Sequence, residues 1–205
     1  MGPLLMFDFD GVIADSLAVF QESLAAALVA HGFASLADRR TFLDIFDDNM
    51  VAGLRQHGVP RAALPALLAD LGARLAAAMD RYPPFPGIPE AFGKLTAAVP
   101  VYVITSNLTG VVSAYLERYG LAGVREVLGS DKEPSKQVKI RRLAAQWPDL
   151  RPVYIGDTLG DMTEAHAVGA LAVAVGWGWH DEARLRRGNP DRFLRTPDEL
   201  ATLAS

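Results

Sequence analysis

The chain has 205 residues, of which 50% are hydrophobic and 21% are charged, a composition typical of a soluble globular protein with a sizeable core. The formal net charge of −4 gives no indication of binding to nucleic acid or to an anionic membrane. The absence of cysteine excludes disulfides and thiolate metal sites, and no apolar run approaches the roughly 18 residues of a membrane span. We therefore expect a cytoplasmic protein with neither nucleic-acid nor membrane partners.

The first predicted strand, residues 3–8, is short and apolar and ends in two carboxylates, Asp8 and Asp10, followed by Gly11. Side chains two apart on a strand lie on the same side, so Asp8 and Asp10 should converge. Two close carboxylates repel each other unless a positive charge lies between them, and a hard divalent cation prefers oxygen ligands. The segment therefore predicts a metal site and a nucleophile.

After this strand the sequence contains only helical patterns for about 65 residues. Ser16 is the predicted N-cap of the first helix and Gly32 its stop. Residues 82–89 are rich in proline, so this segment can be neither the interior of a helix nor a central strand. The expected helices span about 16–31, 36–47, 48–57 and 61–81.

From residue 89 onward, predicted helices and strands alternate. This alternation predicts an α/β fold, a Rossmann-like, mostly parallel sheet flanked by helices. Strands are expected at 99–105, 124–128, 152–156, 171–175 and 192–194, and helices at about 89–98, 108–119, 135–146, 160–168, 180–187 and 197–203.

The first strand must join this sheet, because an isolated strand is not stable. We therefore expect a core catalytic domain made of residues 1–15 and 85–205, with an all-helical cap domain, residues 16–84, inserted into it. A helical insertion at the functional edge of an α/β sheet is placed to act as a lid.

Polar side chains follow three further predicted strands, and the carboxyl ends of parallel strands meet at one edge of the sheet. Thr105-Ser106-Asn107 ends one strand, Lys136 opens a helix with Lys132 close by, and Asp157 and Asp161 follow the strand 152–156. Together these groups offer acids for a cation, donors for an anion and a permanent positive charge. This combination suits a phosphoryl group.

In this order, the four segments resemble the four motifs of the haloacid dehalogenase superfamily of aspartate-nucleophile phosphotransferases, and the insertion resembles its small C1-type cap. The run from Tyr154 to Trp179 is similar to members of the phosphoglycolate-phosphatase type. The resemblance implies a Mg²⁺-dependent phosphatase acting on a small phosphorylated, phosphoglycolate-like metabolite through an aspartyl phosphate. Many members have Lys-Pro at the third motif and this chain does not, so Lys132 remains an alternative to Lys136.

The resemblance also implies a role for each acid. Asp8 is the expected nucleophile, and Asp10 the general acid and then base. Mg²⁺ would be held by the Asp8 side chain, the backbone carbonyl of Asp10 and Asp157. Asp161 would orient metal-bound water or pair with Lys136, although it could also be only a favourable acid in the first turn of a helix.

The remaining implied roles concern the phosphoryl oxygens. Thr105, the Ser106 backbone N–H and Lys136 would hold them. Asn107 either touches the phosphate or only caps a helix. The lid arginines are expected on solvated helix faces, the histidines in structural positions, and Trp179 in core packing rather than at the mouth of the site.

Other functions remain compatible with the motifs. A phosphomutase of the same superfamily is one alternative, and a receiver-like phospho-signalling domain or a non-catalytic protein on the same fold is another. Receivers lack the long helical insertion, and nothing structural requires Asp8, Asp10 and Asp157 together. The sequence does not distinguish a monomer from a homodimer, and it does not identify the substrate.

Overall fold

The computed structural model describes residues 1–204, and within that range a six-stranded parallel sheet is ordered β3-β2-β1-β4-β5-β6. This arrangement confirms the predicted α/β, Rossmann-like class, and it differs from the 2-1-3-4-5 strand order of receiver domains. The strands are β1 Pro3–Phe7, β2 Val101–Ile104, β3 Val127–Leu128, β4 Arg151–Gly156, β5 Leu171–Val175 and β6 Arg192–Leu194.

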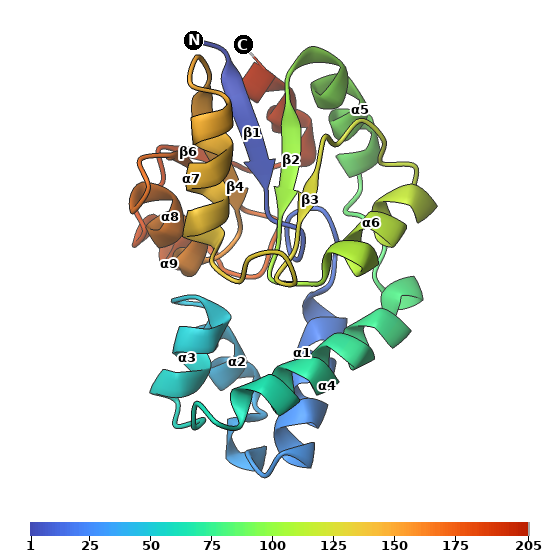
Figure 1. The fold of residues 1–205 in the computed structure, drawn as a ribbon, viewed down its shortest axis with the longest axis vertical. Helices are drawn as coiled ribbons and strands as arrows, with labels where there is room; N and C mark the ends of the chain where they lie inside the picture. Colours follow the sequence, from blue (N-terminus) through green and yellow to red (C-terminus); the bar gives the residue numbers. More distant parts are fainter. Residues whose placement is uncertain (205) are drawn as a thin grey trace.

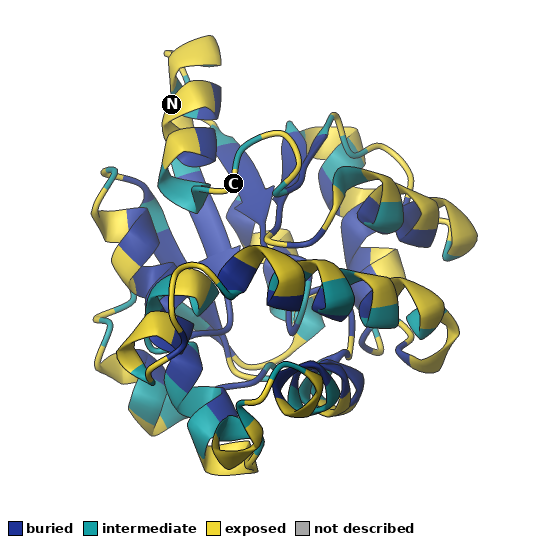
Figure 2. Ribbon diagram, turned by 60° about the horizontal axis from the view of Figure 1, so that its bottom comes forward, coloured by how far each residue is buried: buried dark blue, intermediate teal, exposed yellow. Residues whose placement is uncertain are grey.

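Helices cover both faces of the sheet because alternate strand side chains point to opposite sides. Leu5 and Phe7 pack with one group of helices, and Leu4 and Met6 with the other. Figure 2 shows buried strands between helices whose outer faces are exposed. The first group is α5 Ile88–Ala98, α6 Thr109–Arg118 and η3 Pro197–Ala204, and the second is α7 Lys136–Gln146, α8 Leu159–His166 and α9 Glu182–Arg186.

A separate helical unit lies beyond the carboxyl ends of the strands, at the end of the molecule opposite both chain termini (Figure 1). It has its own apolar core, in which Leu24 and Leu28 of one helix pack with Leu67 and Leu71 of another. We call this unit the cap. Its elements are α1 Leu17–Ala30, η1 Ala34–Leu36, α2 Arg39–Ile45, α3 Met50–Gln56, α4 Leu64–Ala77 and η2 Met79–Arg81.

Several predicted elements are shorter than expected. The strand expected at 124–128 is reduced to Val127–Leu128, the two residues that pair with Val103 and Ile104 of β2. The helix expected at 61–81 ends at Ala77 and is followed by a single 3₁₀ turn, and the last predicted helix is 3₁₀ in form. Among the described residues, none of the helices is long and apolar enough to cross a membrane.

The cap is held against the sheet domain by polar contacts from the segment around α9. The backbone N–H of Leu159 donates to Nδ1 of His180 at 3.0 Å, so Nε2 carries the proton and donates to the Leu43 carbonyl at 3.1 Å. Burial and the neighbouring Arg184 lower the pKa of His180, which favours this neutral form. Arg184 itself bonds Asp44 at 2.7 Å and Asp47 at 2.6 Å. His180 is therefore structural, as expected of the histidines.

Candidate active site

The carboxylates of Asp8 and Asp10 lie where β1 ends, beside the point at which the strand order reverses between β1 and β4. Asp8 Oδ1 accepts a hydrogen bond from the Phe9 N–H at 2.7 Å. Burial raises the pKa of Asp8 to about 6. Burial and the adjacent charge of Asp8 raise the pKa of Asp10 to about 7. The two acids therefore sit in an environment that opposes their charges.

The Ser16 hydroxyl and the Asn107 amide lie near Asp10, and both lower its pKa as donors. Within the described residues, Ser16 Oγ and Asn107 Nδ2 are buried and make no hydrogen bond of ordinary geometry. Ser16 occupies the N-cap position of α1 but its side chain does not cap, so the predicted capping role is wrong. Asn107 Oδ1 accepts from the Leu108 N–H at 2.8 Å, which leaves its amide nitrogen directed to the site.

Lys136 is the first residue of α7, and Ser135 caps that helix by accepting from the Val138 N–H at 3.3 Å. Lys136 Nζ donates to Asp8 Oδ2 and to Asp161 Oδ1, each at 2.7 Å. Burial opposes its charge, but Asp161 and Asp8 outweigh burial and raise the pKa of Lys136 well above its usual value. Lys136 therefore stays charged beside the expected nucleophile.

Lys132 does not reach these acids. Its Nζ donates to Glu126 Oε1 at 3.1 Å and to the Val127 carbonyl at 3.2 Å. The geometry therefore favours Lys136 as the lysine of the site.

Asp161 is fully occupied by donors from the protein. Its Oδ1 accepts from Lys136 and, at 3.3 Å, from the Tyr154 hydroxyl. Its Oδ2 accepts from the Thr158 hydroxyl at 2.7 Å and from two backbone N–H groups, and Thr158 and Asp161 form a capping box at the start of α8. Both interpretations of Asp161 therefore apply, since it caps α8 and positions Lys136.

Asp157 has an oxygen left open. Its side chain is fully buried, and Oδ2 accepts from the Trp179 N–H at 2.7 Å, whereas Oδ1 has no partner in the described part of the chain. Oxygens of Asp8, Asp157 and Asp161 lie within 4.8 Å of one another. Burial and the charges of Asp161 and Asp8 raise the pKa of Asp157 well above its usual value. Crowded carboxylates with one unpartnered oxygen fit a hard divalent cation.

Gly11 makes room for this arrangement. Its φ is 77°, and a Cβ at this position would collide with the Asp157 carboxylate and with the Trp179 ring. Because the left-handed region and the close approach both require glycine, the glycine that follows Asp10 is part of the site's construction.

Removing the charge of Asp157 is expected to stabilise the metal-free protein. The folded-state pKa values of Asp8, Asp10 and Asp157 all lie above the unfolded value, so the folded state holds more protons. Their contribution to the free energy of unfolding therefore falls as pH rises from about 4 to about 7. At about pH 7.5 in EDTA, Asp157→Asn should raise Tm by about 3 °C or more.

Thermal melts in EDTA and in Mg²⁺ test this prediction, with Asp149→Asn, an exposed aspartate, as the control. Mg²⁺ should raise the Tm of the wild type and of the control but not of Asp157→Asn. A lower Tm for Asp157→Asn in EDTA would contradict this account of the acid cluster.

The segment after β2 provides the predicted anion donors. Thr105 is buried, and its hydroxyl oxygen accepts from the Asn107 N–H at 3.0 Å. Ser106 is exposed and lies on the wall of the site. Lys139, which the sequence did not single out, is buried and donates to the Thr105 carbonyl at 2.7 Å. Lys139 therefore fixes the backbone of this segment. Its spacing of one helical turn from Lys136 was the available signal.

A cleft lies between the sheet edge and the cap. Five cap residues line it, and Gly160 of α8 packs against the cap backbone at Asp48. Trp179 lines the cleft and also packs against Phe20, Phe42 and Phe46, so it combines the two roles weighed for it. The cap residues are Phe20, Phe46, Asp48, Asn49 and Met50, and the others are Asp8, Asp10, Ser106, Lys136, Asp157, Thr158, Gly160, Asp161, Glu164 and Trp179.

Six of the predicted site residues thus meet in one cleft, while Thr105 and Asn107 are buried next to it and are not among its lining residues. The sequence did not identify Glu164 or the cap residues that line the cleft. Glu164 lies three residues after Asp161, on the same side of α8, and this helical spacing was its only signal. The cap residues carry no motif.

Comparisons with known proteins agree with this geometry. The model of the haloacid dehalogenase-like hydrolase family matches residues 5–175. The chain is 28% identical over 200 residues to a phosphoglycolate phosphatase from Synechococcus elongatus, covering 96% of this chain and 94% of that protein. It is 32% identical over 186 residues to tyrosine-protein kinase PtkA from Mycobacterium tuberculosis, covering 86% and 62%.

Among solved structures, a haloacid dehalogenase-like protein from Streptococcus pneumoniae superposes with a TM-score of 0.80 at 22% identity, covering 98% of this chain and 97% of that one. The structural likeness concerns the fold. Because the similar proteins differ in the reaction that their names describe, the reaction and substrate have to be argued from the cleft.

Proposed function

Since the chain belongs to the haloacid dehalogenase-like hydrolase family and is a phosphatase of that family, we propose that it hydrolyses a small phosphate monoester through an aspartyl phosphate and depends on Mg²⁺. The observation that carries the proposal is the buried carboxylate cluster. It combines an unpartnered Asp157 oxygen with an Asp8 that Lys136 contacts. Phosphoglycolate, named in several relatives, is the natural reference substrate.

In the first step, an ionised Asp8 oxygen attacks phosphorus while the bond from phosphorus to the ester oxygen breaks. Lys136, 2.7 Å from Asp8, favours this ionised form, and Asp10 gives its proton to the leaving alcohol. An alcohol and an aspartyl phosphate result.

In the second step, Asp10, now a carboxylate, takes a proton from water. The water oxygen attacks phosphorus, the bond to Asp8 breaks, and inorganic phosphate leaves. The pKa of Asp10, raised to about 7, suits a group that must donate and accept a proton near neutral pH.

Other groups of the chain hold the charges in place. The Asp8 side chain, the Asp10 backbone carbonyl and Asp157 are the groups that would hold Mg²⁺, which would neutralise negative charge on the phosphoryl group and on Asp8. Lys136, the Ser106 N–H, Thr105 and the Asn107 amide are the proposed donors to phosphoryl oxygens. Asp161 keeps Lys136 in position.

Metal removal tests the proposal. Hydrolysis of p-nitrophenyl phosphate should fall by at least about 100-fold in EDTA and return when Mg²⁺ exceeds the chelator, because the carboxylate cluster repels a phosphate dianion. Circular dichroism of the EDTA-treated protein controls for unfolding. Full activity in EDTA would rule out the metal dependence, and the release of inorganic phosphate distinguishes hydrolysis from the phosphomutase alternative.

The cytoplasmic location of the protein and its monomeric or homodimeric state remain predictions.

A further inference from the structure

The charge of the cleft is unusual for a site that would hold a carboxylate next to a phosphate. Its lining includes six carboxylates and one ammonium group. That ammonium, on Lys136, already bonds Asp8 and Asp161 at 2.7 Å each. Within residues 1–204, no arginine, histidine or second lysine lines the cleft. Mg²⁺ would offset the charges of Asp8 and Asp157, but among the described lining residues no cationic side chain is left to pair with a carboxylate on the leaving group.

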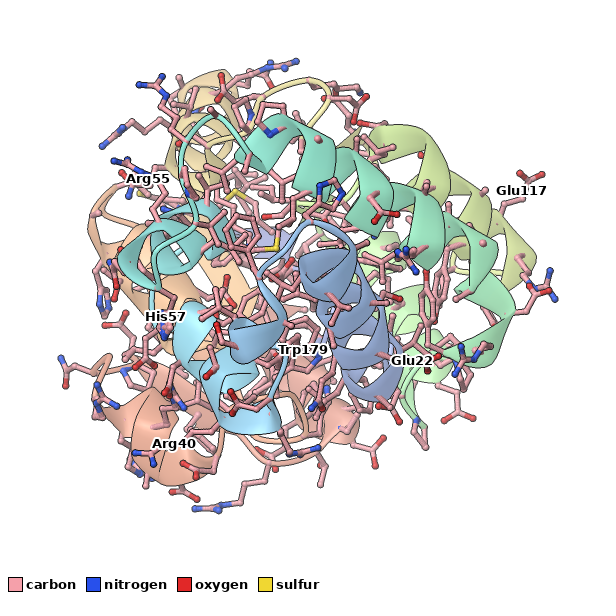
Figure 3. The ribbon with its side chains drawn as sticks, turned by 90° about the horizontal axis from the view of Figure 1, so that it is seen from below. Glu22, Arg40, Arg55, His57, Glu117 and Trp179 are labelled. Atoms are coloured by element: carbon pink, nitrogen blue, oxygen red, sulfur yellow. The ribbon has the colours of Figure 1, made fainter. Side chains whose placement is uncertain are left out.

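The arginines of the cap do not supply one. All are exposed except the half-buried Arg74, which pairs with Asp70, and none lines the cleft. Figure 3, which views the molecule from the cap side, shows Arg40 and Arg55 at the periphery, whereas Trp179 lies near the centre. The expectation of solvated helix faces is therefore confirmed for Arg39, Arg40 and Arg55, whereas Arg61 is exposed but lies in the turn before α4.

Glu164 lies in the cleft without a partner. It is on α8, one turn after Asp161, and is only 6% exposed. No hydrogen bond or ion pair to its carboxyl occurs in the part of the chain that the structure describes. Burial is the main cause that raises the pKa of Glu164. The charge of Lys136 opposes this rise, and the charges of Asp161, Asp8 and the cap residue Asp48 add to it. Because this carboxyl opens onto the cleft, a ligand there can supply the donor that the protein does not.

The proposed mechanism does not use this acceptor. Asp161 already positions Lys136, and Asp8, Asp10 and Asp157 account for the chemistry. Of the five cap side chains that line the cleft, Asp48 and Asn49 are polar, whereas Phe20, Phe46 and Met50 are apolar and can contact a short carbon chain. Ser106 and Asn49 offer neutral donors, but a neutral donor does not balance the charge of a carboxylate.

From the one-sided charge of the cleft and the unpartnered Glu164, we propose that the natural substrate is a phosphate ester whose alcohol carries a hydrogen-bond donor, a hydroxyl or an ammonium group, and no carboxylate. Glu164 accepts the hydrogen bond from this donor, and the acids around it repel a carboxylate at the same place. The inference rests on the proposed phosphatase function and specifies its substrate class.

Three esters of nearly equal size test the inference at about pH 7.5 with Mg²⁺. They are 2-hydroxyethyl phosphate, phosphoethanolamine and 2-phosphoglycolate, which place a hydroxyl, an ammonium or a carboxylate at the same distance from phosphorus. We expect kcat/KM for 2-phosphoglycolate to be at least about tenfold below that of the better of the other two. Which of these two is better identifies a neutral or a cationic leaving group.

The same esters are also measured as inhibitors of p-nitrophenyl phosphate hydrolysis, and 2-phosphoglycolate should bind most weakly. Burial raises the pKa of Glu164 to about 7, so the measurements are made at a pH above this value.

In the variant Glu164→Gln, the ratio of kcat/KM for the better of the other two esters to kcat/KM for 2-phosphoglycolate should fall by about fivefold or more. The reason is that the substitution removes one negative charge from the cleft. Glu117→Gln, at an exposed position on α6 far from the cleft in Figure 3, is the control and should keep the wild-type ranking.

Two results would overturn the inference. One is a wild-type enzyme that prefers 2-phosphoglycolate or binds it most tightly, a result that does not depend on how the variant folds. The other is a Glu164→Gln variant that changes all three esters equally, which would indicate a structural role. A wild-type protein that does not hydrolyse p-nitrophenyl phosphate with Mg²⁺ would instead overturn the proposed function, and this inference with it.

Discussion

Replacing Asp8 with asparagine is expected to lower kcat by at least about 10³-fold, on every phosphate ester that the wild type hydrolyses. The amide oxygen is a poor nucleophile toward phosphorus, so the covalent step is lost. Folding should persist, because burial already opposes the Asp8 charge and a neutral side chain of the same shape keeps the Phe9 N–H partnered. Phosphate release and a thermal melt measure the two effects.

Asp15→Asn is a matched control for this variant, since Asp15 is exposed and lies seven residues further along the same segment. It should retain wild-type activity. If Asp8→Asn kept more than about a tenth of the wild-type kcat, the covalent mechanism would be excluded. The single variant Asp8→Ala guards against slow conversion of the asparagine back to aspartate.

The effect of replacing Asp10 with asparagine should depend on the leaving group. An alkyl alcohol leaves as a poor alkoxide unless it is protonated, so 2-hydroxyethyl phosphate or phosphoethanolamine should lose about 10²- to 10⁴-fold in kcat. p-Nitrophenolate leaves without a proton, so its phosphate ester should lose much less. The ratio of the two losses, measured on the same preparation, isolates the acid role.

The pH profile of the wild type should show the same dependence on the leaving group. A general acid works only in its protonated form, and burial together with the charge of Asp8 raises the pKa of Asp10 to about 7. The wild-type rate on an alkyl ester should therefore fall as pH rises above about 7, and the decline should be weaker for p-nitrophenyl phosphate. Equal losses on both ester types, with parallel pH profiles, would count against Asp10 as the acid.

Much of the fold was predictable because it depends on local patterns. Alternation of apolar strands with helices of about ten residues predicts a parallel sheet, and all six strands lie near their predicted positions. The boundaries were less predictable where tertiary context decides them. For example, β3 is reduced to two residues because it pairs with β2 only at Val103 and Ile104.

The acids of the site were predictable because each lies just after a predicted strand, and parallel strands end at one edge. Other assignments depend on packing between distant segments. Ser16 has the residue type and position of a helix cap, but its hydroxyl is buried near Asp10 instead. Lys139 and Glu164 belong to helices whose patterns did not distinguish them from ordinary charged residues.

The sequence by itself determined the class of fold, the position of the carboxylates and the phosphoryl chemistry that they suit, since these follow from strand periodicity and from residue types at strand ends. Only the tertiary structure decided between Lys136 and Lys132, because the contact from Lys136 to Asp8 spans 128 residues of chain. It also decided which cap side chains face the cleft and that no free cation accompanies Glu164 among the described lining residues. The physical reason is that the net charge of the cleft and the ion pairs inside it depend on how the cap packs against α8. The local sequence does not predict that contact.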